Sequence, residues 1–309
     1  MEPLSLAKCT LCPRACGVNR AAQKGVCGCG DTMRVARAAL HMWEEPCISG
    51  TRGSGAVFFA GCPLRCIFCQ NSAISRGDTG RAYTPAELAE EFLRLQEEGA
   101  ANINLVTAEQ WAVPVHETVA IAKRQGLRIP VLWNSGGYES EETLELLAED
   151  IDIYMPDLKY LDADLAKRFS GAADYPEVAK RAIAKMVEAA GEPEFDEDGY
   201  MTRGVIVRHL VLPGHREESM AVVRYLYETY GDRIYQSILN QYTPPAKTLP
   251  YPELNRRLTR YEYDLVVEYA RKLGVTNAFI QVGATASESF IPEFSVGAED
   301  GGRDGGRES

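Results

Sequence analysis

The sequence predicts an α/β protein in which parallel strands, each followed by a helix, form an open or partial barrel behind a cysteine-rich extension. Two observations support this fold class. Short runs of β-branched residues alternate with amphipathic segments of helical period. All nine cysteines lie within the first 69 residues. We therefore expect a cysteine-rich N-terminal extension over 1–50, a core over 51–285, and a C-terminal segment over 286–309 that is disordered after about residue 297 because it has too few apolar residues.

Seven segments rich in β-branched residues are the candidate strands. In chain order they are Ala56–Ala60, Ile103–Thr107, Val131–Asn134, Ile151–Met155, Val205–Leu212, Ile234–Asn240 and Phe279–Val282. They give about six strand–helix units, and right-handed crossovers bring the carboxyl ends of such strands to one face. We expect the functional site at that face.

Capping residues mark where the helices between these strands begin. Thr84 and Glu87 form a capping box with Pro85 at the first helical position, and Thr259 with Glu262 repeats the box. A further helix is expected after Ser140, and two more are expected over 176–190 and 216–230. The insertion GEPEFDEDGYMTRG is expected to be a peripheral hairpin with Asp198-Gly199 as its turn.

Composition excludes several classes of partner. The chain has 309 residues, 45% of them apolar, which is enough for a substantial core. A net charge of −11 argues against binding nucleic acid. No apolar run is long enough to span a membrane, and MEPLSLAKC has no signal-peptide core, so we expect a cytoplasmic protein. Residues 1–80 carry nine Lys/Arg against five Asp/Glu, which would suit an anionic cofactor or an acidic electron donor, or is ordinary surface variation.

The stretch GCPLRCIFCQN places Cys62, Cys66 and Cys69 in one loop directly after the first strand. Three thiols so close together are candidate metal ligands. A four-iron cluster needs a ligand on each iron, so three thiolates leave one iron open to a substrate or cofactor. Zinc is the alternative, although the loop has no histidine and its cysteines are not in separated pairs.

Polar residues follow several other predicted strands. If the strands are parallel, these residues gather at the same rim as the cysteines and form a site there. They are Glu109 and Gln110, Asn134 to Gly137, Asp157 and Lys159, and Asn240 to Tyr242.

The cysteine spacing, with Phe68 before the last cysteine, resembles the cluster loop of radical S-adenosylmethionine (radical SAM) enzymes. The segments CTLCPRACGVNR, HMWEEPCISG, NINLVTAEQ, MPDLKY, RHLVLPG and FIPEFS resemble the members related to pyruvate formate-lyase activating enzyme, over about residues 9–295. The resemblance implies a partial (β/α)6 TIM-like barrel. It also implies a [4Fe–4S] cluster whose open iron binds S-adenosylmethionine, which is reductively cleaved to a 5′-deoxyadenosyl radical that abstracts hydrogen from a substrate.

The same resemblance implies the remaining site residues. Asp157, Lys159 and Arg208 fall where activating enzymes contact the cofactor or arrange the radical step; the alternative is a structural ion pair. Many members carry a Gly-Gly-Glu segment after the second strand, which this chain lacks, so Thr107 or Glu109 is expected to serve instead. The expected cofactor-binding residues are Phe68, Thr107, Glu109, Asn134, Asp157, Lys159 and Arg208, with no catalytic residue beyond the cluster.

The N-terminal cysteines form a second candidate metal site. Cys9, Cys12, Cys16 and Cys27 have the spacing C-x2-C-x3-C-x10-C, which suits zinc or an auxiliary iron–sulfur cluster. Ligand assignment stays open because Cys29 lies nearby and Cys47 is also available. The four histidines are scattered singly. His209 is expected to be structural, facing away from the Arg208 side of its strand.

We therefore predict a radical SAM enzyme of the glycyl-radical-enzyme activase type, taking hydrogen from a glycine of a partner protein. The expected partners are a reductant such as flavodoxin or ferredoxin and a glycyl radical enzyme or other protein substrate, with no nucleic acid and no membrane. Two alternatives stay open. One is a radical SAM enzyme acting on a small molecule, and the other is a non-catalytic iron–sulfur or zinc protein for electron transfer or binding.

Overall fold

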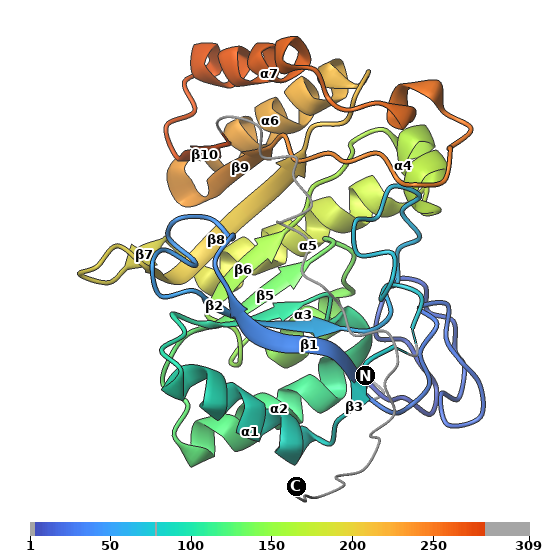
Figure 1. Cartoon of the computed structure of the whole chain (residues 1–309), viewed down its shortest axis with the longest axis vertical. Coiled ribbons are helices and arrows are strands. Elements are labelled where there is room, and N and C mark those ends of the chain that lie inside the picture. The colour runs from blue at the N-terminus through green and yellow to red at the C-terminus, as the bar shows by residue number, and fades with distance from the viewer. Residues whose placement is uncertain (1–3, 78, 282–309) are drawn as a thin grey trace, which may run out of the picture.

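A computed structural model describes residues 4–77 and 79–281. Its centre is a sheet in the order β10-β9-β8-β6-β5-β4-β2-β1-β3 (Figure 1). Seven strands run parallel: β2 (Ser54–Phe59), β4 (Ile103–Val106), β5 (Val131–Ser135), β6 (Ile153–Pro156), β8 (Met201–Leu210), β9 (Tyr235–Leu239) and β10 (Ala278–Ile280). Within the described residues β10 does not pair with β2 or its neighbours, so the sheet is an open, partial barrel, as predicted.

Each predicted strand is present. All seven differ from the observed strands only at their ends, by at most four residues. The C-terminal segment predicted over 286–309 lies outside the described residues.

Two strands were not predicted. β1 (Arg34–His41) pairs antiparallel with β2, and β3 (Arg81–Ala82) pairs antiparallel with β1. The N-terminal extension predicted over 1–50 therefore adds a strand to the main sheet. Along β1 only Val35 is buried, so its sequence shows no clear alternation of apolar and polar residues.

The helices lie along the outer side of the curved sheet (Figure 1). They are α1 (Pro85–Glu97), α2 (Ala112–Gln125), α3 (Glu141–Leu147), α4 (Ala163–Ser170), α5 (Tyr175–Ala190), α6 (Arg216–Tyr230) and α7 (Arg260–Leu273). Both capping boxes are formed, at Thr84 with Glu87 and at Thr259 with Glu262, and Ser140 caps α3. The predicted hairpin is also present, with β7 (Glu194–Phe195) paired to β8.

Alternate residues of the parallel strands pack on opposite sides of the sheet. Trp133 and Tyr154 belong to the large core between sheet and helices, while Leu132, Ile153 and Met155 form a second core on the inner side. The loop after β1 closes that second core with Cys47 and Ile48. This end of the barrel is therefore filled, which leaves the carboxyl ends of the strands as the open face. No helix in the described residues has the length and apolar character needed to cross a membrane.

Candidate functional site

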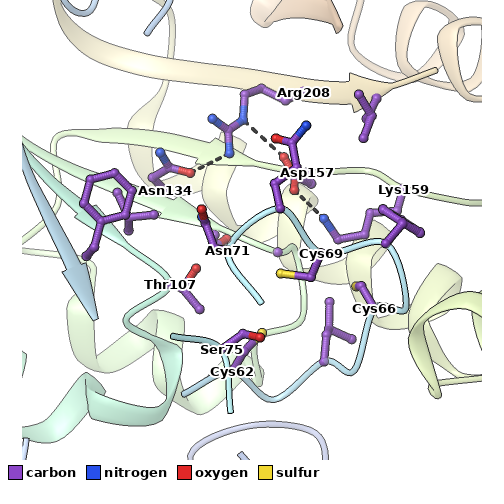
Figure 2. A pocket seen from close by; sticks show the side chains of 18 of the residues that line it. Cys62, Cys66, Cys69, Asn71, Ser75, Thr107, Asn134, Asp157, Lys159 and Arg208 are labelled. Carbon is purple, nitrogen blue, oxygen red and sulfur yellow. Dashed lines mark hydrogen bonds and ion pairs between the residues drawn. The ribbon is translucent and has the colours of Figure 1, made fainter. Parts of the chain in front are cut away.

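A pocket opens at the carboxyl ends of the parallel strands, as the topology predicts. The cysteine loop, which we define as residues 61–71, forms one wall, and residues from the ends of β4, β5, β6 and β8 form the other (Figure 2). The lining includes nine of the predicted site residues, namely Cys62, Cys66, Phe68, Cys69, Thr107, Asn134, Asp157, Lys159 and Arg208.

The three cysteines of the loop lie together on one side of this pocket (Figure 2). Each thiol is partly exposed. The Sγ of Cys66 lies 3.0 Å from the hydroxyl of Ser170 at the end of α4. Burial, together with the neighbouring thiols, raises the pKa of Cys62 and of Cys69. A ligand that stabilises thiolates is therefore needed to charge these side chains at neutral pH.

Backbone amides also point at two of these sulfurs. The N–H of Leu64 bonds to the thiol of Cys62, and the N–H of Asn71 bonds to that of Cys69, which also contacts Ser75. In each case the donor is the residue two positions after the cysteine. Such amides stabilise sulfur that carries negative charge.

A group of charged and polar side chains faces the cysteines across the pocket (Figure 2). The carboxylate of Asp157, just after β6, accepts a hydrogen bond of 3.1 Å from Nε of Arg208 and another from Nζ of Lys159. Nη2 of Arg208 donates to Oδ1 of Asn134 at 2.6 Å. Burial acts against the charge of Asp157, yet the two cations lower its pKa. The pocket therefore holds two cations that share one carboxylate.

Glu44 completes this charged group and was not predicted. Its carboxylate lies 3.5 Å from Nη1 of Arg208 and accepts a hydrogen bond of 2.9 Å from Asn104. Burial raises the pKa of Glu44, although Arg208 acts in the opposite direction. Glu44 follows β1, the strand that the sequence did not reveal. Because β1 runs antiparallel to β2, its last residue, His41, lies beside the start of β2, so recognising β1 alone would have placed HMWEEP at the opposite end of the sheet from the cysteine loop.

Thr107, which was expected to serve in place of a glycine pair, has its backbone in the left-handed region, with φ of 58°. A β-branched residue adopts this conformation at a cost, so its presence marks a position held by its surroundings. The N–H of Thr107 bonds to the carbonyl of Asn134 at 2.8 Å, and the side chain of Gln110 bonds to the carbonyl of Thr107.

Glu109 is the predicted site residue that the structure does not bring to the pocket wall. A 3-10 turn over Glu109–Trp111 directs its carboxylate to the backbone N–H of Gly136, 3.0 Å away. The side chain is fully buried, and burial raises its pKa. It supports the loop after β5 rather than facing the cavity.

The other sequence predictions at the rim have clear outcomes. Gln241 lines the pocket, and its carbonyl accepts a hydrogen bond of 2.7 Å from Gln70 of the cysteine loop. His209 faces away from Arg208 and is buried, with hydrogen bonds of 2.8 Å to the carbonyl of Leu158 and to Ser219. Its structural role is confirmed. Asn71 and Ser75 also line the pocket, and only their position just after Cys69 could have indicated this.

The N-terminal segment lies beside the cysteine loop (Figure 1), and its cysteines do not line the pocket. The two segments are joined by backbone contacts. The N–H of Cys62 bonds to the carbonyl of Cys27, and Nε of Arg14 bonds to the carbonyl of Pro63 at 2.9 Å. Cys47 does not belong to this group of cysteines, because it packs among Leu132, Met155 and other apolar side chains of the inner core.

The fold and this site agree with a family comparison. The chain belongs to the radical SAM superfamily, whose profile matches residues 56–226, from β2 into α6. Members of this superfamily are enzymes, and membership implies a [4Fe–4S] cluster and S-adenosylmethionine as cofactors.

The chain is also similar to individual proteins. The chain is 29% identical over 274 residues to MJ0674 of Methanocaldococcus jannaschii, described as an uncharacterized protein, with 85% of this chain and 74% of the relative covered. Two crystal structures of SuiB from Streptococcus suis, one bound to S-adenosylmethionine and one to the precursor peptide SuiA, share the fold with a TM-score of 0.51. Identity to SuiB is 15%, over 76% of this chain, which spans about half the length of SuiB.

Proposed function

We propose that Cys62, Cys66 and Cys69 hold a [4Fe–4S] cluster, and that S-adenosylmethionine binds in the adjacent pocket against Lys159 and Arg208. One observation carries this proposal: three thiols and two cations line opposite sides of the same pocket. In the part of the chain that the structure describes, no three His, Cys, Asp or Glu side chains converge on a single metal ion. Three thiols spread around a pocket suit a cluster better, because each iron takes its own ligand.

The donor set fits the cofactors chemically. The cluster leaves one iron without a protein ligand, and there S-adenosylmethionine supplies the radical chemistry. The backbone N–H groups of Leu64 and Asn71 are positioned to stabilise ligand sulfurs. Lys159 lies within electrostatic range of Cys66 and Cys69, so it brings a positive charge to this end of the pocket.

The charged group opposite the cysteines would orient the anionic end of the cofactor. Arg208 is held from three sides, by Asp157, Asn134 and Glu44, and so presents a fixed guanidinium. Among the described residues, the Lys159 ammonium pairs only with Asp157. A carboxylate entering the pocket would meet Lys159 and Arg208 without requiring either side chain to reorganise, which favours binding. Phe68 packs against Tyr242 at a ring distance of 6.1 Å and shields the cluster side of the pocket.

Thr107 would fill the role that the glycine pair has in other members. Its left-handed backbone reproduces a conformation that glycine adopts freely, and it lines the pocket next to Asn134. Glu109 would act from behind, by holding the N–H of Gly136.

For the substrate, we propose a glycine of a partner protein, as in pyruvate formate-lyase activating enzyme. The segments MPDLKY and RHLVLPG support this, since they contribute Asp157, Lys159 and Arg208 to the pocket. SuiB, which shares the fold, binds a precursor peptide. An acidic reductant such as flavodoxin or ferredoxin would supply the electron. A small-molecule substrate is the alternative outcome of the test below.

The test is the formation of 5′-deoxyadenosine by anaerobically reconstituted protein with S-adenosylmethionine and a strong reductant. We expect the wild type to form it and Cys66→Ala to form at least 100-fold less, roughly the loss expected for a metal ligand. Cys47→Ala is the matched control, because its thiol lies in the inner core, and it should retain activity. Wild type that forms no nucleoside would overturn the proposal.

The partner is tested separately, by mass spectrometry of a candidate glycyl radical enzyme after exposure of the reaction to air. Cleavage of its chain at one glycine, dependent on Cys66, would support the activase function. Nucleoside formation accompanied by an intact partner would instead indicate a different substrate.

A further inference from the structure

Four cysteines of the N-terminal segment are free thiols, and none of them lines the pocket. They are Cys9, Cys12, Cys16 and Cys27. A methyl group placed on Gly25 would lie 3.3 Å from the Sγ of Cys27 and 3.5 Å from the Sγ of Cys16, so these two sulfurs flank one point. The thiol of Cys12 interacts electrostatically with the other three. We propose that these four thiols form a second, four-thiolate metal centre that holds zinc or an iron–sulfur cluster.

The backbone folds the segment so that the cysteines face one another. The N–H of Cys9 bonds to the carbonyl of Val18, and the N–H of Gly17 returns to the carbonyl of Cys9, at 3.0 and 2.9 Å. The turn between them requires left-handed backbone at Ala15 and Gly17. Such a turn in a segment with little apolar core needs another source of stability, and a metal supplies it.

The N-terminal thiols share a local pattern with those of the cysteine loop. The N–H of Leu11 bonds to the thiol of Cys9, that of Arg14 to Cys12, and that of Cys29 to Cys27. In every case the donor lies two residues after the cysteine, as at Cys62 and Cys69. The same geometry therefore prepares both sets of sulfurs to carry negative charge.

Arg20 provides an independent observation. Only 2% of its surface is exposed, and it makes no ion pair with a carboxylate of the described residues. Nε donates to the carbonyl of Gly30 at 2.7 Å, Nη1 donates to that of Gln110, and the guanidinium packs over Trp111. Nη2 has no hydrogen-bond partner among the residues described.

The thiols are the groups that can supply the missing negative charge. Arg20 lies within electrostatic range of the sulfurs of Cys9, Cys27 and Cys29. A buried cation needs an anion. Four thiolates around a divalent metal carry two net negative charges, and loading the centre releases one proton from each thiol to solvent.

The structure also decides between the six available cysteines. Cys47 packs in the inner core. The Sγ of Cys29 lies 3.4 Å from the carbonyl of Ala60 and presses against Gly61, while its thiol contacts that of Cys27. Cys29 therefore supports a ligand rather than acting as one. In the described chain no three of these thiols converge on a single metal ion, as at the cysteine loop, which favours a cluster for the N-terminal set; zinc would require the thiols to turn about χ1.

The centre would brace the loop that lines the pocket. Besides the bonds of Cys27 and Arg14 to the cysteine loop, Nη2 of Arg65 bonds to the carbonyl of Val26 at 2.5 Å. Fixing Cys27 thus fixes the start of the loop that contains Cys62.

The test is metal analysis of the full chain in which Cys62, Cys66 and Cys69 are all alanine, so that any bound metal reports on the N-terminal set. After anaerobic loading we expect about one zinc or about four irons per chain. Adding Cys12→Ser should lower that content at least tenfold, whereas adding Cys47→Ser should leave it unchanged. Cobalt substitution with thiolate charge-transfer absorption identifies the mononuclear site, and labile sulfide identifies the cluster. No metal in the triple variant, or full retention in Cys12→Ser, would overturn the proposal.

A second measurement covers the case in which Cys12→Ser fails to fold. Limited trypsin digestion of the triple variant should cut at exposed Lys24 at least tenfold faster after a chelator is added, with cleavage outside 1–30 unchanged. Arg20→Met should release the metal at an approximately tenfold lower chelator concentration. A digestion rate that does not respond to the chelator in either protein would contradict a metal centre in this segment.

Discussion

Asp157 is the carboxylate on which the charged side of the pocket depends, and its loss has a calculable cost. The side chains of Lys159 and Arg208 are 18% and 17% exposed, and that of Asp157 is 26% exposed. At an effective dielectric constant near 20, one contact pair is worth about 4 kcal/mol before desolvation is subtracted. Asp157→Asn removes two such pairs but also removes a charge that burial disfavours. We expect a net destabilisation of about 2–3 kcal/mol.

A double-mutant cycle isolates the part of this cost that belongs to Lys159. Lys159 makes no other ion pair within the described residues, whereas Arg208 keeps Glu44 and Asn134. Asp157→Asn leaves Lys159 charged and unpaired, and adding Lys159→Met removes that charge. The double variant should therefore be more stable than the sum of the single effects by about 1–2 kcal/mol.

The assay is urea unfolding of the metal-free protein, with Glu177→Gln as the control. Glu177 pairs with Lys180 at 2.9 Å but is 70% exposed, so its loss should cost less than about 0.5 kcal/mol. Because the folded-state pKa of Asp157 lies below its ordinary value of 3.8, the stabilisation is present above that pH and is lost as pH falls through the folded pKa. An Asp157→Asn protein as stable as wild type at pH 7, or strictly additive effects, would refute the reasoning.

Two further predictions concern the segment between β5 and α3. Gly137→Ala would place a methyl group 2.3 Å from the carbonyl oxygen of Asp157 and should cost at least about 2 kcal/mol of stability in thermal unfolding. The control is Gly126→Ala, which also has positive φ but open space around it and should cost about 1 kcal/mol. Equal losses in the two variants would contradict the predicted clash. Burial raises the pKa of Glu139 from 4.5 to about 8. The free energy of unfolding of the wild type should therefore fall as pH rises from about 4.5 to 8. At about 1.4 kcal/mol per pKa unit, the loss is at most several kcal/mol. Glu139→Gln should flatten that dependence and raise the melting temperature at pH 8 but not at pH 5, and an unchanged pH profile would show that Glu139 is not the titrating group.

The parts of the fold that could be predicted are those that short stretches of sequence mark by themselves. The capping boxes at Thr84 and Thr259 mark the starts of α1 and α7, and the buried parallel strands are short apolar runs. Since parallel strands end at one face, the rim position of Asp157 and Lys159 followed without any structure. β1 was missed because its residues, nearly all partly buried, show no alternation of apolar and polar side chains, and Glu44 was missed with it.

Side-chain direction was harder to predict than position. Alternation along β8 correctly separated Arg208, which faces the pocket, from His209, which does not. No such rule applied to Glu109, where a 3-10 turn directs the carboxylate toward Gly136. The choice among the N-terminal cysteines likewise depended on contacts, since spacing could not separate Cys29 from Cys27.

The central claim is that three thiolates hold a cluster with one iron open to S-adenosylmethionine. The most direct measurement is electron paramagnetic resonance of the reduced, reconstituted protein, recorded with and without S-adenosylmethionine in a background where Cys12 is serine. The account predicts a four-iron signal that changes when S-adenosylmethionine is added and that disappears in Cys66→Ala. A cluster signal that S-adenosylmethionine leaves unchanged, or one that survives the loss of Cys66, would contradict it.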